Sequence, residues 1–480
     1  MTQPTMPNRY SGAPEAPSPL EASVLAELTS VGVTIDTGDS ERAEHARDWW
    51  PRLIPDVAAG RVENWPGVVV KAHSANDVRA TLRVASAHGI PVTAQGGRSS
   101  VVGGATPSPG AIALDLTGLN RVLDLDEVSG TVRVEAGVFG PDLESALAQR
   151  GFTAGHFPQS FDLATVGGWI ASRGAGQFSN RYGTIDDLVR ALTVVLASGE
   201  LVHLGGHGPR EAVGPDLVQL FIGSEGTLGV ITDATLVVRR IATYEQRRAY
   251  SFSTFTEGLE ACRRVLQRGA RPAVLRLYDE NESTRHFDIT ECALIVLDEG
   301  DKGLVDATIA IVDDECRAAR SHDESLVGRW LERRNDVSAL APLWEGGLVV
   351  DTIEVAAPWS LLAALHENVA RVLRECAGMI AVSVHQSHAY LDGACLYFTF
   401  AAKPENDAPA FYRHAWDVAM AEVIAHGGAI SHHHGVGRNR ARFVADALGD
   451  SFSILAGLKS LLDPLGIMNP GVLGLGDTPW

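Results

Sequence analysis

The sequence predicts an α+β protein of at least two domains, and three observations support this prediction. The chain has 480 residues, which is more than one ordinary hydrophobic core organises. Hydrophobic residues make up 45% of the chain and charged residues 21%, as in a folded globular protein. Near residue 241 the short strand patterns of the front half give way to longer helical patterns interleaved with strands. We therefore expect a second domain to begin there.

The first predicted elements follow a segment rich in Pro, Ser and Ala, residues 1–20, which we expect to be a mobile lead-in. A helical pattern then spans residues 20–32. Residues 67–97 have the pattern of a strand, a helix and a strand, with Ser74 suited to cap the helix and Gly89 suited to end it. This segment predicts a βαβ-like unit.

The remaining elements follow from short alternating runs and longer periodic ones. Two apolar-alternating strands flank the turn "VSGT", residues 128–131, and indicate an α+β layer. Further patterns predict helices at 140–151, 254–270 and 357–377, a strand at 394–402, and a final helix within 453–474 that Pro464 interrupts. No internal repeat is evident.

Charge and composition exclude several classes of partner. The formal net charge of −19 and the isoelectric point near 5.3 disfavour a nucleic-acid binder, which needs clustered Lys and Arg. The acidic balance therefore favours a small-molecule partner. No stretch approaches the roughly 18 apolar residues that a membrane span needs. We expect no export signal, because the N-terminus lacks a basic start followed by an apolar run. The five cysteines are scattered and form no C-x-x-C pair, so we expect reduced thiols and a cytoplasmic location.

Three stretches rich in small residues lie within the front half. Residues 94–105, "AQGGRSSVVGGA", directly follow a predicted strand, and their paired glycines allow backbone N–H groups to converge on phosphate oxygens. This loop is neither a G-x-G-x-x-G turn into a crossover helix nor a P-loop, and taken alone it could be a surface turn. Residues 164–183 and 221–232 are similar in character. Together the three stretches indicate a diphosphate-bearing ligand.

Three motifs, "TVGGWI", "SHHHGVG" and "IMNPG", identify a similarity to a known family, and this similarity extends over nearly the whole chain beyond residue 45. The sequence resembles the FAD-linked oxidase superfamily, which has the vanillyl-alcohol oxidase or PCMH-type fold. Within it the segments "VLRLYDENES", "GACLYFTF" and "DPLGIMNPG" are most similar to alkyldihydroxyacetonephosphate synthase and its bacterial FAD-binding oxidoreductase relatives. The resemblance implies a two-subdomain PCMH-type FAD-binding domain plus a cap domain with an antiparallel sheet and flanking helices.

The resemblance also implies a division of the chain. Residues 1–45 are expected to form the lead-in and a helix, residues 46–240 the FAD-binding domain, residues 241–430 the cap, and residues 431–480 a segment that returns to the FAD domain. The active site is then expected at the interface of the two domains, where ligand pockets are often found. By family habit we expect a homodimer.

The cofactor that the resemblance implies is FAD, and its contacts are carried over residue by residue. The diphosphate is expected along Gln95, Gly96, Gly97, Arg98, Ser99, Ser100, Val101 and Val102. The flavin and ribityl chain are expected against Pro158, Asp162, Thr165, Gly168, Ser172, Ser179 and Tyr182, the adenine-ribose end near Glu225, Gly226 and Ile231, and further contacts at Arg438 and Asn469. The family often links FAD covalently to a His in the first loop, but Arg98 stands in that neighbourhood. We therefore expect a noncovalent flavin.

The consecutive histidines His432, His433 and His434 are the candidate proton-handling groups. On a strand, adjacent side chains face opposite sides, so His432 and His434 are expected to share a face without His433, which disfavours one metal ion bound by all three. The pKa of imidazole suits general acid or base chemistry, and matching histidines line the flavin pocket in the resembling synthases. A structural histidine cluster is the plainer alternative.

Two further residues are candidates for the active site. Tyr397 matches the family's active-site tyrosine, although an aromatic residue on a buried strand is the default for any single Tyr. Arg276 alternates with apolar neighbours, and a buried guanidinium needs an anion, either a substrate carboxylate or phosphate or a structural partner such as Asp279 or Glu282.

No metal ion is expected. His388 falls where related 2-hydroxyacid dehydrogenases carry an "HxGDGNxH" metal motif, but here Tyr397 replaces the second His in effect and the acidic core is reduced to Asp392. His388 is as well suited to a hydrogen-bonded pocket wall as to a ligand.

One position, Leu340, distinguishes a synthase reaction from an oxidoreductase reaction. The synthases carry an Arg for the substrate phosphate where this chain has Leu340 in "SALAP", although Arg333 or Arg334 could compensate. The sequence therefore favours an FAD-dependent oxidoreductase that oxidises an alcohol or 2-hydroxy acid by hydride transfer to flavin N5, with His433, His434 or Tyr397 taking the hydroxyl proton. A synthase-like transferase without net redox and a catalytically silent flavin-binding protein are the alternatives. The substrate and the electron acceptor, whether oxygen, a quinone or a carrier protein, stay open.

Overall fold

The computed structural model describes residues 16–58, 60–336, 343–344 and 346–476. Of the expected lead-in, residues 1–15 lie outside the described part, and so does Leu340. The first helix is α1 (Ala22–Ser30), followed by α2 (Asp39–Glu44), the short helix η1 (Pro51–Leu53) and α3 (Ile54–Ala58). None of the helices in the described ranges combines the length and apolar character that a bilayer crossing requires.

A four-stranded sheet opens the front half of the molecule. Its strands lie in the order β1 (Thr34–Asp36), β2 (Val68–Lys71), β4 (Ile112–Asp115) and β3 (Val92–Gln95). The helix α4 (Ala75–His88) connects β2 to β3, and both β2 and β3 pair in parallel with β4. The Ser74 hydroxyl accepts a hydrogen bond from the Asp77 backbone N–H, and Gly89 has a φ of 63°, which glycine adopts without strain. The predicted βαβ-like unit and both helix-end residues are therefore confirmed.

A second sheet of five antiparallel strands packs beside the first. Its order is β5 (Val122–Asp126), β6 (Thr131–Glu135), β10 (Val230–Val237), β8 (Val189–Val195) and β9 (Leu201–Gly205). Short helices connect its strands: α5 (Gly140–Ala148), α6 (Val166–Ala171), α7 (Ser179–Tyr182), α8 (Ile185–Leu188) and α9 (Val218–Phe221). A two-stranded ribbon, β7 (Phe152–Thr153) with β11 (Arg239–Arg240), closes this half.

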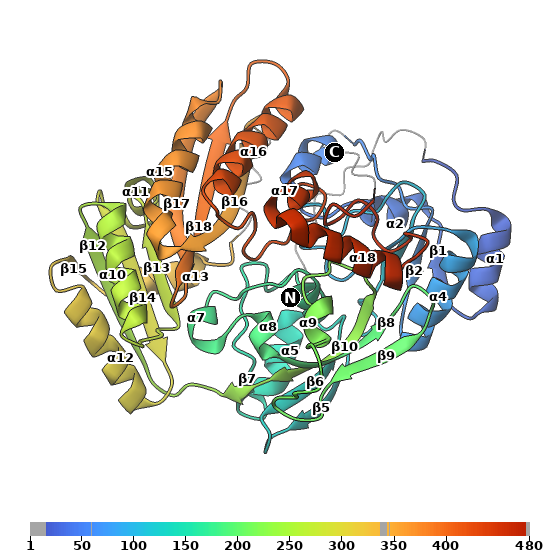
Figure 1. The fold of residues 1–480 in the computed structure, drawn as a ribbon, viewed down its shortest axis with the longest axis horizontal. Coiled ribbons are helices and arrows are strands. Elements are labelled where there is room, and N and C mark those ends of the chain that lie inside the picture. The colour runs from blue at the N-terminus through green and yellow to red at the C-terminus, as the bar shows by residue number, and fades with distance from the viewer. Residues whose placement is uncertain (1–15, 59, 337–342, 345, 477–480) are drawn as a thin grey trace.

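The cap contains one seven-stranded antiparallel sheet (Figure 1). Its order is β15 (Arg320–His322), β12 (Glu245–Phe252), β14 (Cys292–Glu299), β13 (Val274–Tyr278), β17 (Met379–Ala389), β18 (Gly393–Ala402) and β16 (Val349–Pro358). The helices of the cap are α10 (Phe255–Gln267), α11 (Glu280–Phe287), α12 (Lys302–Glu315), α13 (Ser325–Arg333), α15 (Trp359–Glu375) and α16 (Ala408–Ala425). A large apolar core between the sheet and α10, α12, α15 and α16 holds the cap together.

The C-terminal segment returns to the front half of the molecule. It forms η3 (Ala441–Phe443), α17 (Val444–Leu448), η4 (Gly449–Ser451) and α18 (Phe452–Leu462), which Figure 1 shows in red beside the blue N-terminal elements. The buried Lys459 ammonium of α18 donates to the Thr227 and Met468 carbonyls, and Met468 forms a bridge with Val92 of β3. The helix ends two residues before Pro464, as predicted.

A polar network joins the two halves across their interface. The indole N–H of Trp50, which precedes η1, donates to the Tyr412 hydroxyl of α16 at 3.0 Å. Tyr412 and Trp416 of α16 both donate to the buried carboxylate of Asp351 on β16. Because these donors come from both halves, the network fixes the cap against the front of the molecule.

Candidate functional site

A cavity of about 850 Å³ lies between the front half and the cap. All three glycine-rich stretches line one wall, and the cap sheet with α11 and α13 lines the other. A volume of this size is at the upper end of the range for cofactor and substrate pockets, roughly 300 to 1,000 Å³. The expected location of the site between two domains thus agrees with the position of the cavity.

The first glycine-rich loop offers a row of free backbone donors to this cavity. In the described part of the chain no hydrogen bond is made by the backbone N–H groups of residues 97–101, although residues 96–101 all line the cavity. Backbone donors of folded proteins almost always have partners, so such a row requires water or a ligand. Arg98 has a φ of 54°, which turns successive N–H groups toward one side. An anion such as a diphosphate satisfies these donors.

The first two loops approach each other so closely that only glycine fits between them. A Cβ atom on Gly97 would lie 1.7 Å from the Leu163 carbonyl oxygen, and one on Gly96 would lie 2.1 Å from the Thr165 Oγ1 atom. Any larger residue must push the loops apart. The free donors, this close packing and the cavity volume together fit an FAD molecule.

Replacing Gly97 with alanine is expected to weaken FAD binding by about 10- to 100-fold, since overpacking a tight contact costs about 1–3 kcal/mol. The measurement is the flavin absorbance per protein after purification and FAD titration. Gly457→Ala on α18, where an added Cβ meets nothing within 4 Å, is the matched control and should keep its flavin. Acid precipitation of the wild type should release the flavin to the supernatant, since we predict noncovalent attachment. Full loading of Gly97→Ala would contradict the assigned role of the loop.

The predicted cofactor residues divide into two groups. Those that line the cavity are Gly96, Gly97, Arg98, Ser99, Ser100, Val101, Pro158, Thr165, Gly168, Ser172, Glu225, Gly226 and Ile231. Those outside its lining are Gln95, Val102, Asp162, Ser179, Tyr182, Arg438 and Asn469.

Most residues of the second group have side chains that hold the loops from behind. Asn469 donates to the carbonyls of Gly104 and Glu225, and Arg438 donates to the carbonyl of Thr106. The Tyr182 hydroxyl donates to Glu299, the last residue of β14 in the cap. These residues therefore position the walls of the cavity from outside and do not form its surface.

Residues 39–50 brace the first loop, although no motif in this segment indicates such a role. The Asp48 carboxylate accepts from the backbone N–H groups of Trp50 and Ala105, and the Trp49 N–H donates to the Ser100 carbonyl. Burial raises the pKa of Asp48 to about 6. His45 lies 2.6 Å from the Gln95 side chain. Trp49 also lines the cavity, so this segment belongs to the site.

The "SHHHGVG" segment forms a loop, and the expectation of strand geometry for its histidines is wrong. The buried carboxylate of Glu354 on β16 accepts from the backbone N–H groups of His432 at 2.6 Å and His434 at 2.8 Å, and from the Ser431 hydroxyl. These bonds curl the chain around one carboxylate, so neighbouring side chains no longer alternate between two faces. Arg440, which is fully buried, pairs with the same carboxylate at 2.9 Å.

A second buried carboxylate fixes the other end of this loop. Glu225 of the third glycine-rich stretch accepts from the backbone N–H groups of Val436 at 2.7 Å and Gly437 at 2.8 Å. Its oxygens are therefore engaged by the loop, although Glu225 also lines the cavity. Burial raises the pKa of Glu225 to about 7.

Hydrogen-bond partners decide which imidazoles near the cavity can take a proton. His388 bonds the Gly176 carbonyl through Nε2 at 3.0 Å and the Ser387 hydroxyl through Nδ1 at 2.9 Å. His385 donates from Nδ1 to Glu282 at 2.8 Å and accepts from Arg276 at Nε2, also at 2.8 Å. Both nitrogens of each ring are thus engaged, and these two histidines orient other groups.

His433 and His434 line the cavity and are left as candidate bases, whereas His432 lies outside the cavity lining. The His433 Nδ1 atom lies 2.9 Å from His432 Nδ1, and its Nε2 makes no hydrogen bond within the described residues. The His434 Nδ1 atom is buried without a hydrogen-bond partner, 3.6 Å from Glu354. Burial lowers the pKa of His432 and of His434 to about 4, so both are neutral at pH 7.

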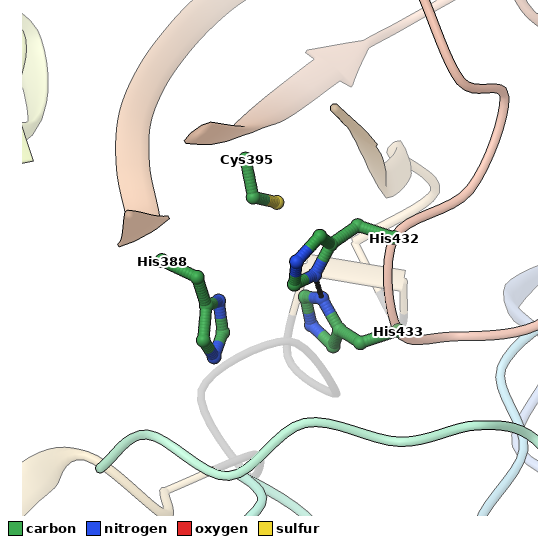
Figure 2. A group of neighbouring side chains, drawn as sticks. All are labelled: His388, Cys395, His432 and His433. Atoms are coloured by element: carbon green, nitrogen blue, oxygen red, sulfur yellow. Dashed lines mark hydrogen bonds between the residues drawn. The ribbon is translucent and has the colours of Figure 1, made fainter. Parts of the chain in front are cut away.

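Four side chains with metal-binding atoms lie close together, as Figure 2 shows, and two of them, His388 and His433, line the cavity. They are His388, Cys395, His432 and His433, whose donor atoms all lie within 4.8 Å of one another. The imidazole nitrogens, apart from His433 Nε2, are occupied by protein hydrogen bonds, and burial raises the pKa of the Cys395 thiol. This arrangement is that of a hydrogen-bonded cluster, and the absence of a metal stays our prediction.

Arg276 on β13 carries a buried positive charge into the cavity wall. Its guanidinium donates to His385 and, at 3.1 Å, to the Tyr278 hydroxyl, both of which are neutral partners. Of the two anions that the sequence left open for Arg276, the structural partner Asp279 or Glu282 is absent from the contacts of the described residues. Asp279 accepts from the Glu282 and Val384 N–H groups, and Glu282 accepts from His385. The charge of Arg276 is therefore available to a bound anion.

Further arginines surround Arg276 on the same wall. Arg334 donates to Gln177 at 2.8 Å and lies over the rings of Phe157 and Phe178. Burial, and next the like charge of Arg276, lower the pKa of Arg334. Arg333 also lines this wall. In a chain of net charge −19, such a group of arginines favours a negatively charged ligand.

Tyr397 on β18 lines the cavity between the arginines and the histidines. Its hydroxyl donates to Thr352 at 3.1 Å, and its ring stacks on His385 with centroids 4.7 Å apart. The His433 and His434 rings lie 6.1 and 5.5 Å from it. Burial raises the pKa of Tyr397, so it remains a neutral hydroxyl that can hydrogen-bond a substrate oxygen.

Comparisons with known proteins agree with this geometry. Residues 66–205 match the model of an FAD binding domain, and residues 243–473 match that of the C-terminal domain of FAD linked oxidases. The chain is 32% identical to the uncharacterized FAD-linked oxidoreductase YgcU of Escherichia coli O157:H7, over 88% of this chain and 92% of that protein. It is 29% identical to the alkyldihydroxyacetonephosphate synthase of Dictyostelium discoideum, over 86% of this chain and 74% of that protein. A solved structure of an alkyldihydroxyacetonephosphate synthase superposes with a TM-score of 0.80 at 25% identity, covering 96% of this chain and 88% of that one.

Proposed function

The chain belongs to the FAD-linked oxidase family and is an FAD-dependent enzyme, and from this premise we propose that it oxidises an anionic 2-hydroxy acid or a related alcohol. The observation that carries this proposal is the composition of the cap wall. Arg276 is a buried arginine that has no carboxylate partner among the residues that the structure describes, and His433 is a neutral imidazole whose Nε2 has no partner among them. Both line the same cavity as the three glycine-rich loops. A hydroxy acid matches both, since its carboxylate needs a cation and its hydroxyl needs a base.

The residues of the chain have separate tasks in this reaction. The backbone N–H groups of residues 97–101 are expected to hold the diphosphate. Arg276, oriented by His385 and Tyr278, binds the carboxylate of the substrate. His433 takes the proton of the hydroxyl at Nε2, and the neutral hydroxyl of Tyr397 hydrogen-bonds the same oxygen. When bound, FAD supplies the acceptor for the hydride that leaves the substrate carbon.

The test is anaerobic mixing of the purified holoprotein with a panel of primary alcohols, 2-hydroxy acids and the amides of those acids. We expect at least one 2-hydroxy acid to bleach the visible flavin absorbance, and its amide to do so far more slowly. If nothing in the panel bleaches the flavin, the proposed oxidation is wrong. A silent flavin-binding protein would resist reduction by every compound.

A transferase reaction like that of alkyldihydroxyacetonephosphate synthase is the second candidate. It is favoured by the arginines of the cap wall, since Arg333 and Arg334 line the same cavity as Arg276 and can meet the charge of a phosphate. Leu340, which weakens this reading in the sequence, lies outside the described residues. An acyl dihydroxyacetone phosphate that perturbs the flavin spectrum without bleaching it, while hydroxy acids do nothing, would favour this candidate.

A further inference from the structure

Two imidazoles and a phenol form a continuous hydrogen-bonded chain that begins at the cavity. His433 Nδ1 lies 2.9 Å from His432 Nδ1, and His432 Nε2 lies 2.6 Å from the Tyr390 hydroxyl. We propose that this chain carries the proton of the substrate hydroxyl out of the cavity, from His433 at its inner end to Tyr390 at its outer end. The inference rests on the proposed oxidation, in which the hydroxyl proton of the substrate must leave the cavity.

The two ends of the chain lie where such a relay needs them. His433 lines the cavity, and its Nε2 is neither hydrogen-bonded within the described ranges nor sealed from the cavity. Tyr390, at the end of β17, is not part of the cavity lining and is partly exposed. It lies in the electrostatic field of Asp186 and Asp187 on α8. The chain thus runs from the cavity to a partly exposed residue outside the cavity lining.

The contact between two Nδ1 atoms allows two proton arrangements. In the first, His433 Nδ1–H donates to His432, His432 Nε2–H donates to the Tyr390 oxygen, and His433 Nε2 is an unprotonated base. In the second, the Tyr390 hydroxyl donates to His432 Nε2, His432 Nδ1–H donates to His433, and His433 Nε2 carries a proton. Conversion of the first arrangement into the second moves one proton from the cavity to the surface.

The reaction balances along this path. The C–H hydrogen of the substrate would leave with both bond electrons as a hydride, for which bound oxidised FAD would be the acceptor, and the C–O bond would become C=O. The hydroxyl proton passes to His433 Nε2, the His433 Nδ1 proton to His432, the His432 Nε2 proton to the Tyr390 oxygen, and the Tyr390 proton to water. An acceptor such as oxygen or a quinone that takes up a proton in the second half-reaction draws it inward along the same path and resets the chain.

The environment of His433 favours transfer of the proton to His432 over retention of the proton on His433. Burial lowers the pKa of His433 well below its ordinary value, so an imidazolium at this position is costly. Burial also raises the pKa of Tyr390, which keeps its hydroxyl intact between turnovers. His434 lacks such an outlet, since its Nδ1 atom is buried without a hydrogen-bond partner. His433 is therefore the base, and His432 and Tyr390 are positioning residues that act through it.

The kinetic test uses the holoenzyme, its Tyr390→Phe variant and the Tyr250→Phe control. Tyr250 lies in the same cap sheet, and its hydroxyl contacts Asp313, outside the cavity lining. Flavin reduction is followed anaerobically in mixtures of H₂O and D₂O, with a substrate found in the panel. For wild type and Tyr250→Phe we expect a curved plot of the reduction rate against the fraction of D₂O, because several protons move together. For Tyr390→Phe we expect a reduction rate about 10-fold lower and a linear plot. Substrate affinity should be the same in all three. A wild-type rate in Tyr390→Phe, or a linear wild-type plot, would overturn the relay.

The spectroscopic test does not need a substrate. In holoprotein labelled with ¹⁵N-histidine, we expect a through-hydrogen-bond coupling between the Nδ1 atoms of His432 and His433, and neutral shifts for both rings at pH 7. In Tyr390→Phe the His432 tautomer equilibrium should move, because Nε2 has lost its partner. A missing coupling or a charged ring would overturn the relay. If the panel yields no substrate, the proposed function fails, and this test still decides whether the chain exists.

Discussion

Replacing Glu354 with alanine is expected to lower the free energy of unfolding by about 3–5 kcal/mol, because it strands the fully buried Arg440 without its carboxylate partner. The backbone N–H groups of His432 and His434 lose their acceptor at the same time. We expect the histidine loop to shift and the rate of flavin reduction to fall by about 100-fold, which is the scale of a misplacement near 1 Å. Thermal unfolding followed by circular dichroism and anaerobic stopped-flow absorbance measure the two effects.

Two further variants separate stability from positioning. The double variant Glu354→Leu with Arg440→Met removes both charges and should recover most of the lost stability, as buried ion pairs replaced by apolar residues often do. It should stay slow in flavin reduction, because leucine cannot accept from the loop. Glu260→Ala on α10, which breaks an exposed ion pair with Arg263 and Arg264, should cost at most about 1 kcal/mol. An unfolding temperature for Glu354→Ala equal to that of wild type would contradict the expected role of the pair.

Replacing Arg276 with leucine is expected to lower kcat/KM for an anionic substrate by about 30-fold to several thousand-fold. Truncating one partner of a desolvated charge pair costs about 2–5 kcal/mol, and the guanidinium has no carboxylate partner among the described residues. The measurement compares a 2-hydroxy acid with its amide. Wild type should prefer the acid strongly, whereas Arg276→Leu should accept both about equally.

The controls for Arg276 come from the chain itself. Arg276→Lys keeps the charge but not the planar fork, so it should restore only part of the loss. Arg248→Leu removes another arginine of the same sheet, whose partner is Asp313, and should change kcat/KM less than about 2-fold. If Arg276→Leu retains the preference for the acid, the carboxylate binds elsewhere.

Local signals in the sequence were sufficient for much of the fold. Ser74 and Gly89 mark the ends of α4 because capping depends on the residue and its immediate neighbours. The break of α18 before Pro464 is equally local. The three glycine-rich stretches indicated a cofactor site because free backbone amides and close loop packing need small residues wherever they occur.

Contacts between distant segments explain what the sequence did not reveal. The strand geometry expected for the histidines failed because Glu354, far from them in the sequence, gathers the N–H groups of His432 and His434 around one carboxylate. The sequence left open whether Arg276 pairs with a bound anion or with Asp279 or Glu282, and it could not reveal that Arg276 donates to His385 on another strand. Tyr390 carries no motif that distinguishes it from any other tyrosine, and only its contact with His432 identifies it.

The loop of residues 431–437 is held by Glu354 of the cap at one end and by Glu225 of the front half at the other. Neither half of the molecule alone retains the shape of this loop. Chimeras that exchange caps between relatives to alter substrate choice must therefore transplant the histidine segment together with a matched pair of glutamates. A chimera joined near residue 241 would take Glu225 from one parent and Glu354 from the other. It would keep the loop only where both parents have a glutamate at each of these positions.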